Sequence, residues 1–292
     1  MAHIWTLGTT ALAGFLLSTQ ISEAQTPGRD CVDDVACPVD VDGQPPRQYY
    51  VSLPTEIEAN EPLPMILWYH GFRGSGVAGI RNRNLVEHWT DAGYIFVATD
   101  GVEGRWTHQG TPWTEPNDED YSVAVIEDLA EAYSIDRDRV VAAGFSSGGF
   151  MVWHLACFQG APFTHYAPVS GAFWEPLPEL CDAGPVTLRH THGTADTVVP
   201  LEGRWLRNNT LKQGDVFESF DVMIANNVCE TSPDATDIAV PPSSCSIWQS
   251  CTAGGVLELC LHDGGHGVPT GWSASTQDWI EATVAAEPAT TH

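Results

Sequence analysis

One short stretch limits the possible folds more than any other part of the chain: 142-AAGFSSGGFMVWHLAC-157. Within it, Gly144-Phe145-Ser146-Ser147-Gly148 has the pattern G-x-S-x-G, typical of a sharp turn that lifts a serine hydroxyl into a cleft. An apolar strand-like run precedes the motif and an apolar helix-like run follows it, as that turn requires. A plain glycine-rich connection is the alternative. We predict that Ser146 is a nucleophile, provided that the chain supplies a base, an acid and an oxyanion site.

Strand-like and helix-like segments alternate along the chain. Strand patterns occur at 49–53, 65–69, 94–98, 139–143, 165–169, 186–190 and 256–259. Helical spacing of apolar residues occurs at 80–91, 122–134, 148–159, 202–212, 216–227 and 273–285. This alternation predicts an α/β fold with a mostly parallel central sheet and helices on both of its faces. Residues 228–250, rich in Pro, Ser, Asp and Cys, are predicted to form an irregular insertion.

Length and composition predict one catalytic domain behind a secretion signal. Residues 1–24 contain an apolar run, Ala11–Leu17, and a small-x-small cleavage pattern at 22–24, which together are typical of a signal peptide. The remaining residues, 25–292, can bury a full core as a single domain, since 43% of the chain is apolar. No later apolar run is long enough to span a membrane. We expect a secreted protein, either extracellular or periplasmic.

The formal net charge of −26 limits the partners of this chain. Such a surface repels nucleic acid and anionic membranes, so we expect neither as a partner. A saline habitat would account for the acidic surface, but the charge does not identify a substrate.

Eight cysteines indicate disulfides rather than a metal site, since no C-x-x-C pair or His/Cys cluster is present. Residues 245–251 and 255–261 resemble an antiparallel hairpin, and its register would bring Cys245 near Cys260. Sequence leaves the connectivity open, and our choice is Cys31–Cys37, Cys157–Cys181, Cys229–Cys251 and Cys245–Cys260. Residues 40–43 (DVDG) resemble a calcium loop but lack the acidic ligand at its end, so we interpret them as a solvated turn and predict no metal.

A nucleophilic serine needs a histidine base and an acid that orients it, in the chain order Ser, Asp or Glu, His. Asp196 and His266 each come just after a predicted strand, and both follow Ser146 in that order. A helix-capping role is the alternative for Asp196. His262 is the rival base, but it is predicted to lie within the last strand; Asp263 is the rival acid, but it is too close in sequence to His266 to orient it easily. We predict a triad of Ser146, Asp196 and His266.

Backbone amides after the strand 65–69 and after Ser146 are the expected oxyanion donors. The segment 70-HGFRGSG-76 follows that strand, so the N–H groups of Phe72 and Ser147 are the candidates. A phosphate-binding loop is the alternative, but no G-K-[ST] follows. Three tryptophans on predicted loops are assigned to an aromatic substrate-binding cleft, with packing in the core or on the surface as the alternative: Trp106, Trp113 and Trp174.

Five segments, in chain order, resemble one known family: VDGQPPRQYYVSLP, LWYHGF, RVVAAGFSSGGFMVWHLAC, THGTADTVVP and DGGHGVP. They span roughly residues 40–272 and are similar to secreted esterases of the polyhydroxybutyrate depolymerase type, which include feruloyl and acetylxylan esterases. The resemblance implies an α/β-hydrolase that cleaves esters through an acyl-enzyme without metal or cofactor. It also implies that Ser146 is the nucleophile, Asp196 the acid and His266 the base, with the Phe72 and Ser147 amides as oxyanion donors.

Two departures from that family concern the substrate. Many relatives have G-G-G-H-T-W-P-G around the base, whereas 264-GGHGVP-269 lacks the tryptophan, which removes a wall of the acyl pocket. Phe72 stands where many relatives have a small residue or a cysteine. Both changes leave the hydrolytic residues intact.

We therefore expect a secreted serine ester hydrolase. The acyl donor would be an oligomer of hydroxyalkanoate or another polyester, or a feruloyl or acetyl group on plant polysaccharide. One alternative is a serine peptidase of the same fold, because a triad does not distinguish amides from esters. The other is a secreted binding module without chemistry, which would be favoured if Ser146 were buried or His266 lay beyond reach of Ser146 and Asp196.

Overall fold

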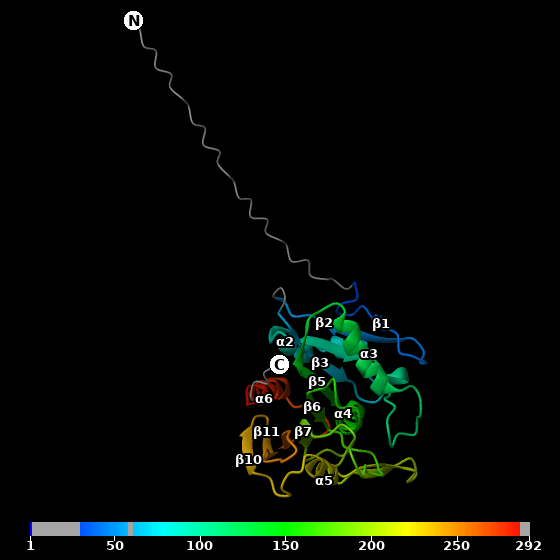
Figure 1. The fold of residues 1–292 in the computed structure, drawn as a ribbon. Coiled ribbons are helices and arrows are strands. Elements are labelled where there is room, and N and C mark those ends of the chain that lie inside the picture. Colours follow the sequence, from blue (N-terminus) through cyan, green and yellow to red (C-terminus); the bar gives the residue numbers. More distant parts are fainter. Residues whose placement is uncertain (2–29, 58–60, 287–292) are drawn as a thin grey trace.

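A ten-stranded sheet forms the centre of the computed structural model, which describes residues 1, 30–57 and 61–286 (Figure 1). Its strands, in spatial order, are β1 (Cys37–Val39), β2 (Arg47–Ser52), β4 (Ile95–Thr99), β3 (Leu63–Tyr69), β5 (Ile135–Phe145), β6 (His165–Val169), β7 (Thr187–Gly193), β12 (Leu257–His262), β11 (Ser243–Trp248) and β10 (Ala235–Val240). The strands from β4 to β12 pair in parallel, and antiparallel strands extend the sheet at both ends. The carboxyl ends of the parallel strands therefore meet along one edge of the sheet.

Helices cover both faces of this sheet, as the sequence predicts. They are α1 (Gly76–Ile80), α2 (Arg83–Asp91), α3 (Asp118–Ala130), α4 (Ser147–Phe158), α5 (Val216–Asn226) and α6 (Trp272–Ala286), with a short 3-10 turn, η1 (Val102–Gly104). Side chains of β3 alternate between the two faces: Leu67 packs in the core shared with α3, α4 and α5, and Trp68 packs in the core shared with α1, α2 and α6. Figure 1 shows α2 and α6 on the side of the sheet opposite α3 and α4. Burial on both faces explains why these strands are continuously apolar.

The segment 202–212 is not a helix, and that prediction is wrong. It forms a separate two-stranded hairpin, β8 (Arg204–Leu206) and β9 (Leu211–Gln213). Its turn, 207–209, has three successive non-glycine residues with positive φ, which a right-handed helix does not allow. At the base of the hairpin, a Cβ on Gly203 would overlap the carbonyl oxygen of Gln213. Apolar spacing alone did not reveal this reversal of the chain.

The segment 228–250 is not irregular either, which corrects a second prediction. Residues 235–240 and 243–248 are strands β10 and β11, and β11 pairs antiparallel with β12 so that Cys245 lies opposite Cys260. The structure contains four disulfides, and their pairs match those chosen from the sequence: Cys31–Cys37, Cys157–Cys181, Cys229–Cys251 and Cys245–Cys260. Two of these bonds therefore hold the added hairpin at the end of the parallel sheet.

Other sequence predictions concern segments away from the sheet. Apart from Met1, the expected signal peptide, residues 1–24, lies outside the described residues. Within the described ranges, no helix combines the length and apolar character needed to cross a membrane. Residues 40–43 form a turn in which the Gln44 amide donates to the Val41 carbonyl.

His165, on β6, gives the fold a pH-dependent contribution to stability. Its ring is buried beside Trp279 and hydrogen bonds to the hydroxyl groups of Thr164 and Thr283. Burial lowers the pKa of His165 to about 4. Below pH 6.5 the histidine binds a proton in the unfolded chain but not in the folded protein. The contribution of His165 to the free energy of unfolding is therefore fully present above pH 6.5 and is lost as the pH falls from 6.5 to about 4.

We expect His165 to lower the free energy of unfolding by about 2 kcal/mol as the pH falls from 6.5 to 4.5. Urea unfolding across this range should give a shallower pH slope for His165→Gln than for the unaltered protein, because glutamine does not titrate. Equal slopes would show that His165 does not contribute to the acid sensitivity.

Candidate active site

The G-x-S-x-G segment forms a sharp turn between β5 and α4. Ser146 has φ 56° and ψ −119°, a conformation that L-residues rarely adopt, and its side chain is partly exposed. Close backbone contacts require the flanking glycines: a Cβ on Gly148 would overlap the Tyr69 carbonyl, and one on Gly144 would lie 2.6 Å from the Gly148 carbonyl oxygen. The turn thus holds the Ser146 hydroxyl above the carboxyl edge of the sheet.

Ser146, His266 and Asp196 form one chain of hydrogen bonds. His266 Nε2 lies 2.9 Å from Ser146 Oγ, and His266 Nδ1 lies 2.7 Å from Asp196 Oδ2. The three residues follow β5, β12 and β7, parallel strands of one sheet, so their loops emerge at the same edge. The arrangement allows His266 to accept the serine proton while Asp196 orients the imidazole.

Hydrogen bonds keep the Asp196 carboxylate charged. Its Oδ1 accepts from the backbone amides of Val198 and Val199, each at 2.8 Å, which leaves Oδ2 for His266. Burial by itself raises the pKa of Asp196, but these amides and His266 outweigh it and hold the pKa below its usual value. The two amides belong to the residues two and three positions after Asp196, and no helix begins near residue 202 for it to cap.

The rival residues lie elsewhere. His262 is the last residue of β12, and its Nδ1 accepts the Gly264 amide at 3.0 Å. Asp263 is exposed, and it is Asp196 that contacts the His266 ring. Among the alternatives weighed from sequence, the geometry therefore favours Asp196 and His266.

A row of buried side chains behind Asp196 was not found by sequence reasoning. The indole N–H of Trp153 donates to His190 Nδ1 at 3.3 Å, so the other nitrogen of His190 carries the proton and donates to His192 Nδ1 at 2.9 Å. His192 Nε2 then donates to the Val199 carbonyl at 2.8 Å. Burial lowers the pKa of both histidines, so the row is neutral and fixes the turn that carries Asp196. Histidines two apart on one strand face, in HTH, were the available signal.

The loop after β3 brings a backbone amide to the same place. A Cβ on Gly71 would lie 3.4 Å from Ser146 Cβ, so this loop passes directly beside the serine. Neither the Phe72 amide nor the Ser147 amide donates a hydrogen bond within the described part of the chain. His70 braces the loop: its Nε2 accepts the Gly101 amide at 3.0 Å, and its Nδ1 donates to the Gly71 carbonyl at 2.9 Å. Two N–H groups are therefore free for an oxyanion beside Ser146.

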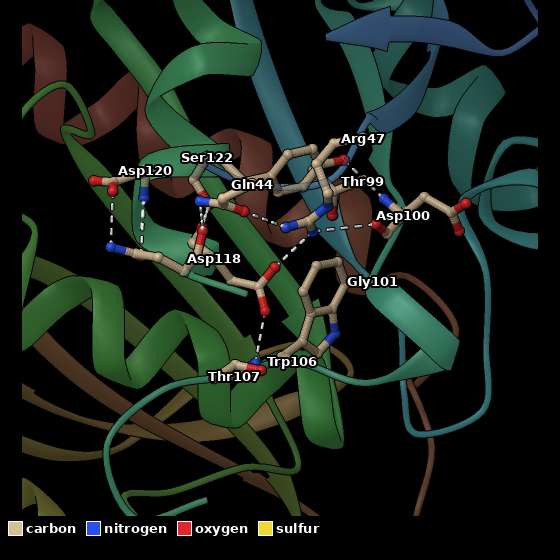
Figure 2. Close-up of polar contacts among 12 residues, drawn as sticks. Gln44, Arg47, Thr99, Asp100, Gly101, Trp106, Thr107, Asp118, Asp120 and Ser122 are labelled. Atoms are coloured by element: carbon tan, nitrogen blue, oxygen red, sulfur yellow. Dashed lines mark hydrogen bonds and ion pairs between the residues drawn. The ribbon is translucent and has the colours of Figure 1, made fainter. Parts of the chain in front are cut away.

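A buried ion pair between Arg47 and Asp118 lies beside the segment that binds His70 (Figure 2). Arg47 Nη2 lies 2.6 Å from Asp118 Oδ1, and both side chains are 1% exposed. The other carboxylate oxygen of Asp118 accepts the Thr107 amide at 2.6 Å, which anchors the segment 100–107. That segment carries the Gly101 amide that binds His70, so the ion pair is connected to the candidate oxyanion loop.

The assignment of Trp106 to a substrate cleft is wrong. Its side chain is fully buried, it packs against Tyr69 and His70, and its indole N–H donates to the His70 carbonyl at 2.8 Å. Trp106 therefore supports the oxyanion loop from inside the protein. Its place on an irregular segment gave no sign of this burial, because the partner carbonyl lies 36 residues away.

Trp106→Phe is expected to lower the free energy of unfolding by about 1–2 kcal/mol, because the buried His70 carbonyl loses its donor while the aromatic packing is kept. Chemical denaturation measures this loss. A wall residue would instead raise KM for bulky esters without loss of stability, and that result would restore the original assignment.

Trp113 and Trp174 are both partly buried. Trp113 stacks on Phe72, whose exposed ring lies on the oxyanion loop, with ring centroids 6.4 Å apart. Trp174 stacks on Phe150 at 4.6 Å and pairs with Gln213 at the base of the β8–β9 hairpin. A role in substrate binding stays a prediction for both.

One group of potential metal ligands is found in the described residues: Cys245, Glu258 and Cys260. Both sulfur atoms are joined to each other in a disulfide and have no thiolate to offer. This group therefore does not fit a metal ion.

A serine on a strand–helix elbow, with an acid and a histidine after later strands of a mostly parallel sheet, defines an α/β-hydrolase. Comparisons with known proteins agree. Residues 49–179 match the family model of X-Pro dipeptidyl-peptidase (S15 family). Among solved structures, the acetyl xylan esterase from Aspergillus awamori shares the fold with a TM-score of 0.59 at 13% identity, over 80% of this chain and 93% of that one.

Curated relatives are named esterases. Feruloyl esterase C of Emericella nidulans is 27% identical over 243 residues, which cover 78% of this chain and 80% of the relative. A probable feruloyl esterase C of Aspergillus terreus is also 27% identical and covers 93% of this chain and 94% of its own length. The chain is thus an α/β-hydrolase of the esterase type, similar to feruloyl esterases.

Proposed function

We propose that this protein is a secreted serine esterase that removes feruloyl or acetyl groups from plant polysaccharide. One observation carries the proposal: the hydrogen-bonded chain from Asp196 through His266 to Ser146, beside two unoccupied backbone amides. The names of the relatives support the substrate class, since feruloyl esterases and an acetyl xylan esterase both act on esters. Four disulfides support secretion, because such bonds persist in oxidising compartments.

In the proposed mechanism, Ser146 Oγ attacks the ester carbonyl while His266 Nε2 takes its proton. The Phe72 and Ser147 amides stabilise the oxyanion that develops on the carbonyl oxygen. Collapse of the tetrahedral intermediate releases the alcohol, which receives its proton from His266. Water, activated by His266 in turn, then attacks the acyl-serine and releases the acid.

A fluorophosphonate and an ester panel together test the proposal. The probe should modify Ser146 alone, as mapped by peptide mass spectrometry, and activity should be lost in proportion to labelling. The panel contains methyl ferulate, acetylated xylan, hydroxybutyrate oligomers and an alanyl-proline anilide. Faster hydrolysis of the first two supports the proposal, whereas preference for the oligomers indicates a polyesterase.

The anilide tests the alternative that the protein is a serine peptidase, which the match to the S15 peptidase family supports. That match ends at residue 179, before Asp196 and His266, so it covers the serine elbow but not the whole triad. Preferential cleavage of the anilide would favour the peptidase. Failure of the probe to label Ser146, with no hydrolysis of any substrate, would favour the binding module.

A further inference from the structure

The positive charges of this acidic protein are distributed unevenly. Of its 12 Lys and Arg residues, Arg29 lies outside the described ranges. Eight others each form an ion pair with a carboxylate: Arg47, Arg81, Arg83, Arg105, Arg137, Arg139, Arg189 and Lys212. Among the residues that the structure describes, three arginines have no such partner: Arg73, Arg204 and Arg207.

These three arginines come from two segments that are far apart in sequence, the candidate oxyanion loop and the β8–β9 hairpin. Arg73 directly follows Phe72 on the candidate oxyanion loop. Arg204 donates to the carbonyl of Thr197, the residue after Asp196, and so joins the β8–β9 hairpin to the acid loop. Arg207 lies at the turn of that hairpin. In a chain with 38 acidic residues, these arginines without a carboxylate partner add positive charge on segments beside the candidate triad.

Aromatic rings arrange two of these charges into a platform. The Arg73 guanidinium lies 5.4 Å from the centre of the Phe72 ring, and the Arg207 guanidinium lies 5.3 Å from the centre of the Trp113 ring. Phe72 and Trp113 are stacked on each other. Both distances are within the range of cation–π attraction, which holds the guanidinium groups in place while leaving their N–H donors available.

The platform, defined here as Phe72, Trp113, Arg73 and Arg207, remains positively charged. Arg105 also approaches Trp113, at 5.1 Å, but Glu103 pairs with it and cancels its charge. Arg73 and Arg207 are both exposed. These two exposed guanidinium groups suit a carboxylate, which arginine binds through paired N–H donors. One of them belongs to Arg73, the residue after the candidate oxyanion residue Phe72.

We propose that this platform selects substrates that carry a carboxylate near the scissile ester, above all uronic acid units of an esterified polysaccharide. The proposal rests on the proposed esterase function and deepens it by naming the charge of the preferred substrate. The carboxylate end of a hydroxyacid oligomer offers the same chemistry, so the experiment separates the two sources.

The test compares matched esters. One pair is an acetylated xylo-oligosaccharide with a glucuronic acid branch and the same compound after reduction of its carboxyl to a hydroxymethyl group. The second pair is a hydroxybutyrate trimer with a free carboxylate and its methyl ester. For the saccharide pair we expect kcat/KM to favour the acid by about three- to tenfold at low salt, and to approach equality near 1 M salt, where screening reduces the range of charge interactions to about 3 Å.

Variants assign the preference to the platform. The double variant Arg73→Gln/Arg207→Gln should bring the acid-to-neutral ratio of kcat/KM close to one at low salt. Arg137→Gln removes an exposed arginine that is paired with Glu127 on α3, and it should keep the full ratio. Equal hydrolysis of the saccharide pair by the unaltered protein, or a full ratio in the double variant, would overturn the proposal. A preference confined to the trimer pair would overturn the uronic acid source.

Failure of the esterase proposal is recognised separately. If neither member of either pair is hydrolysed, calorimetric binding of the unesterified uronic acid oligosaccharide to Ser146→Ala protein still reports on the platform. Binding that weakens about threefold or more in Arg73→Gln/Arg207→Gln supports the platform even then, and binding that is absent or unchanged refutes it.

Discussion

Replacing Asp196 by Asn is expected to lower kcat for ester hydrolysis by about 10⁴-fold. The carbonyl oxygen of the new amide would stay on the Val198 and Val199 amides, which currently donate to Asp196 Oδ1. Its NH₂ group would then face His266 Nδ1 and donate to it. That contact places the imidazole proton on Nε2, where His266 can no longer accept the proton of Ser146. Steady-state kinetics on methyl ferulate measure the loss.

Asp263→Asn is the matched control, since Asp263 was the rival acid and is exposed. We expect its kcat to stay within about twofold of the unaltered enzyme, as is usual for an exposed surface change. A large loss in Asp263→Asn together with a small loss in Asp196→Asn would reverse the assignment of the acid. Circular dichroism confirms that both variants are folded.

Asp118→Asn is expected to lower the free energy of unfolding by about 3–5 kcal/mol, the usual result of breaking a buried ion pair. Arg47 would keep its charge in the interior without a counter-ion. Since the Asp118 carboxylate accepts from both Arg47 and the Thr107 amide, an asparagine must turn its NH₂ toward one of these donors. The melting temperature should fall by about 10 °C.

Asp34→Asn breaks a different kind of ion pair and provides the comparison. Arg81 and Asp34 are 65% and 58% exposed, so their pair should contribute less than about 1 kcal/mol. Guanidinium unfolding of both variants ranks the two pairs. Equal, small losses would mean that the Arg47–Asp118 pair does not anchor the segment 100–107.

Much of the fold could be predicted because its parallel strands are short apolar runs separated by amphipathic segments. A strand that is buried on both faces, such as 65–69, must be apolar throughout. This pattern can be recognised in the sequence without knowing which strands lie beside it. The candidate triad could be predicted from the sequence for a related reason. Ser146, Asp196 and His266 each follow a strand of the same sheet, and parallel strands bring such loops together.

The remaining features depend on contacts that no local pattern encodes. Residues 202–212 have apolar spacing suited to a helix, but the positive φ angles at 207–209 reverse the chain into a hairpin that pairs with the segment around Trp174. The burial of Trp106 depends on the distant His70 carbonyl. The edge strand at 235–240 is mostly exposed, so hydrophobic periodicity did not reveal it. The hairpin predicted from residue 245 onward is confirmed by the antiparallel pairing of β11 with β12.

The β8–β9 hairpin carries one residue of the proposed platform, Arg207, on a segment that is separate from the candidate triad. It begins after Gly203 and ends before Gly214, and Ser146, Asp196 and His266 all lie outside it. We expect mutations confined to the turn 207–209 to change which esters are preferred while the reacting groups keep their positions, because Arg204, which donates to the acid loop, is left unchanged. Related proteins could differ in substrate preference through changes in this one short segment. A library of variants limited to it would vary substrate preference with little effect on kcat.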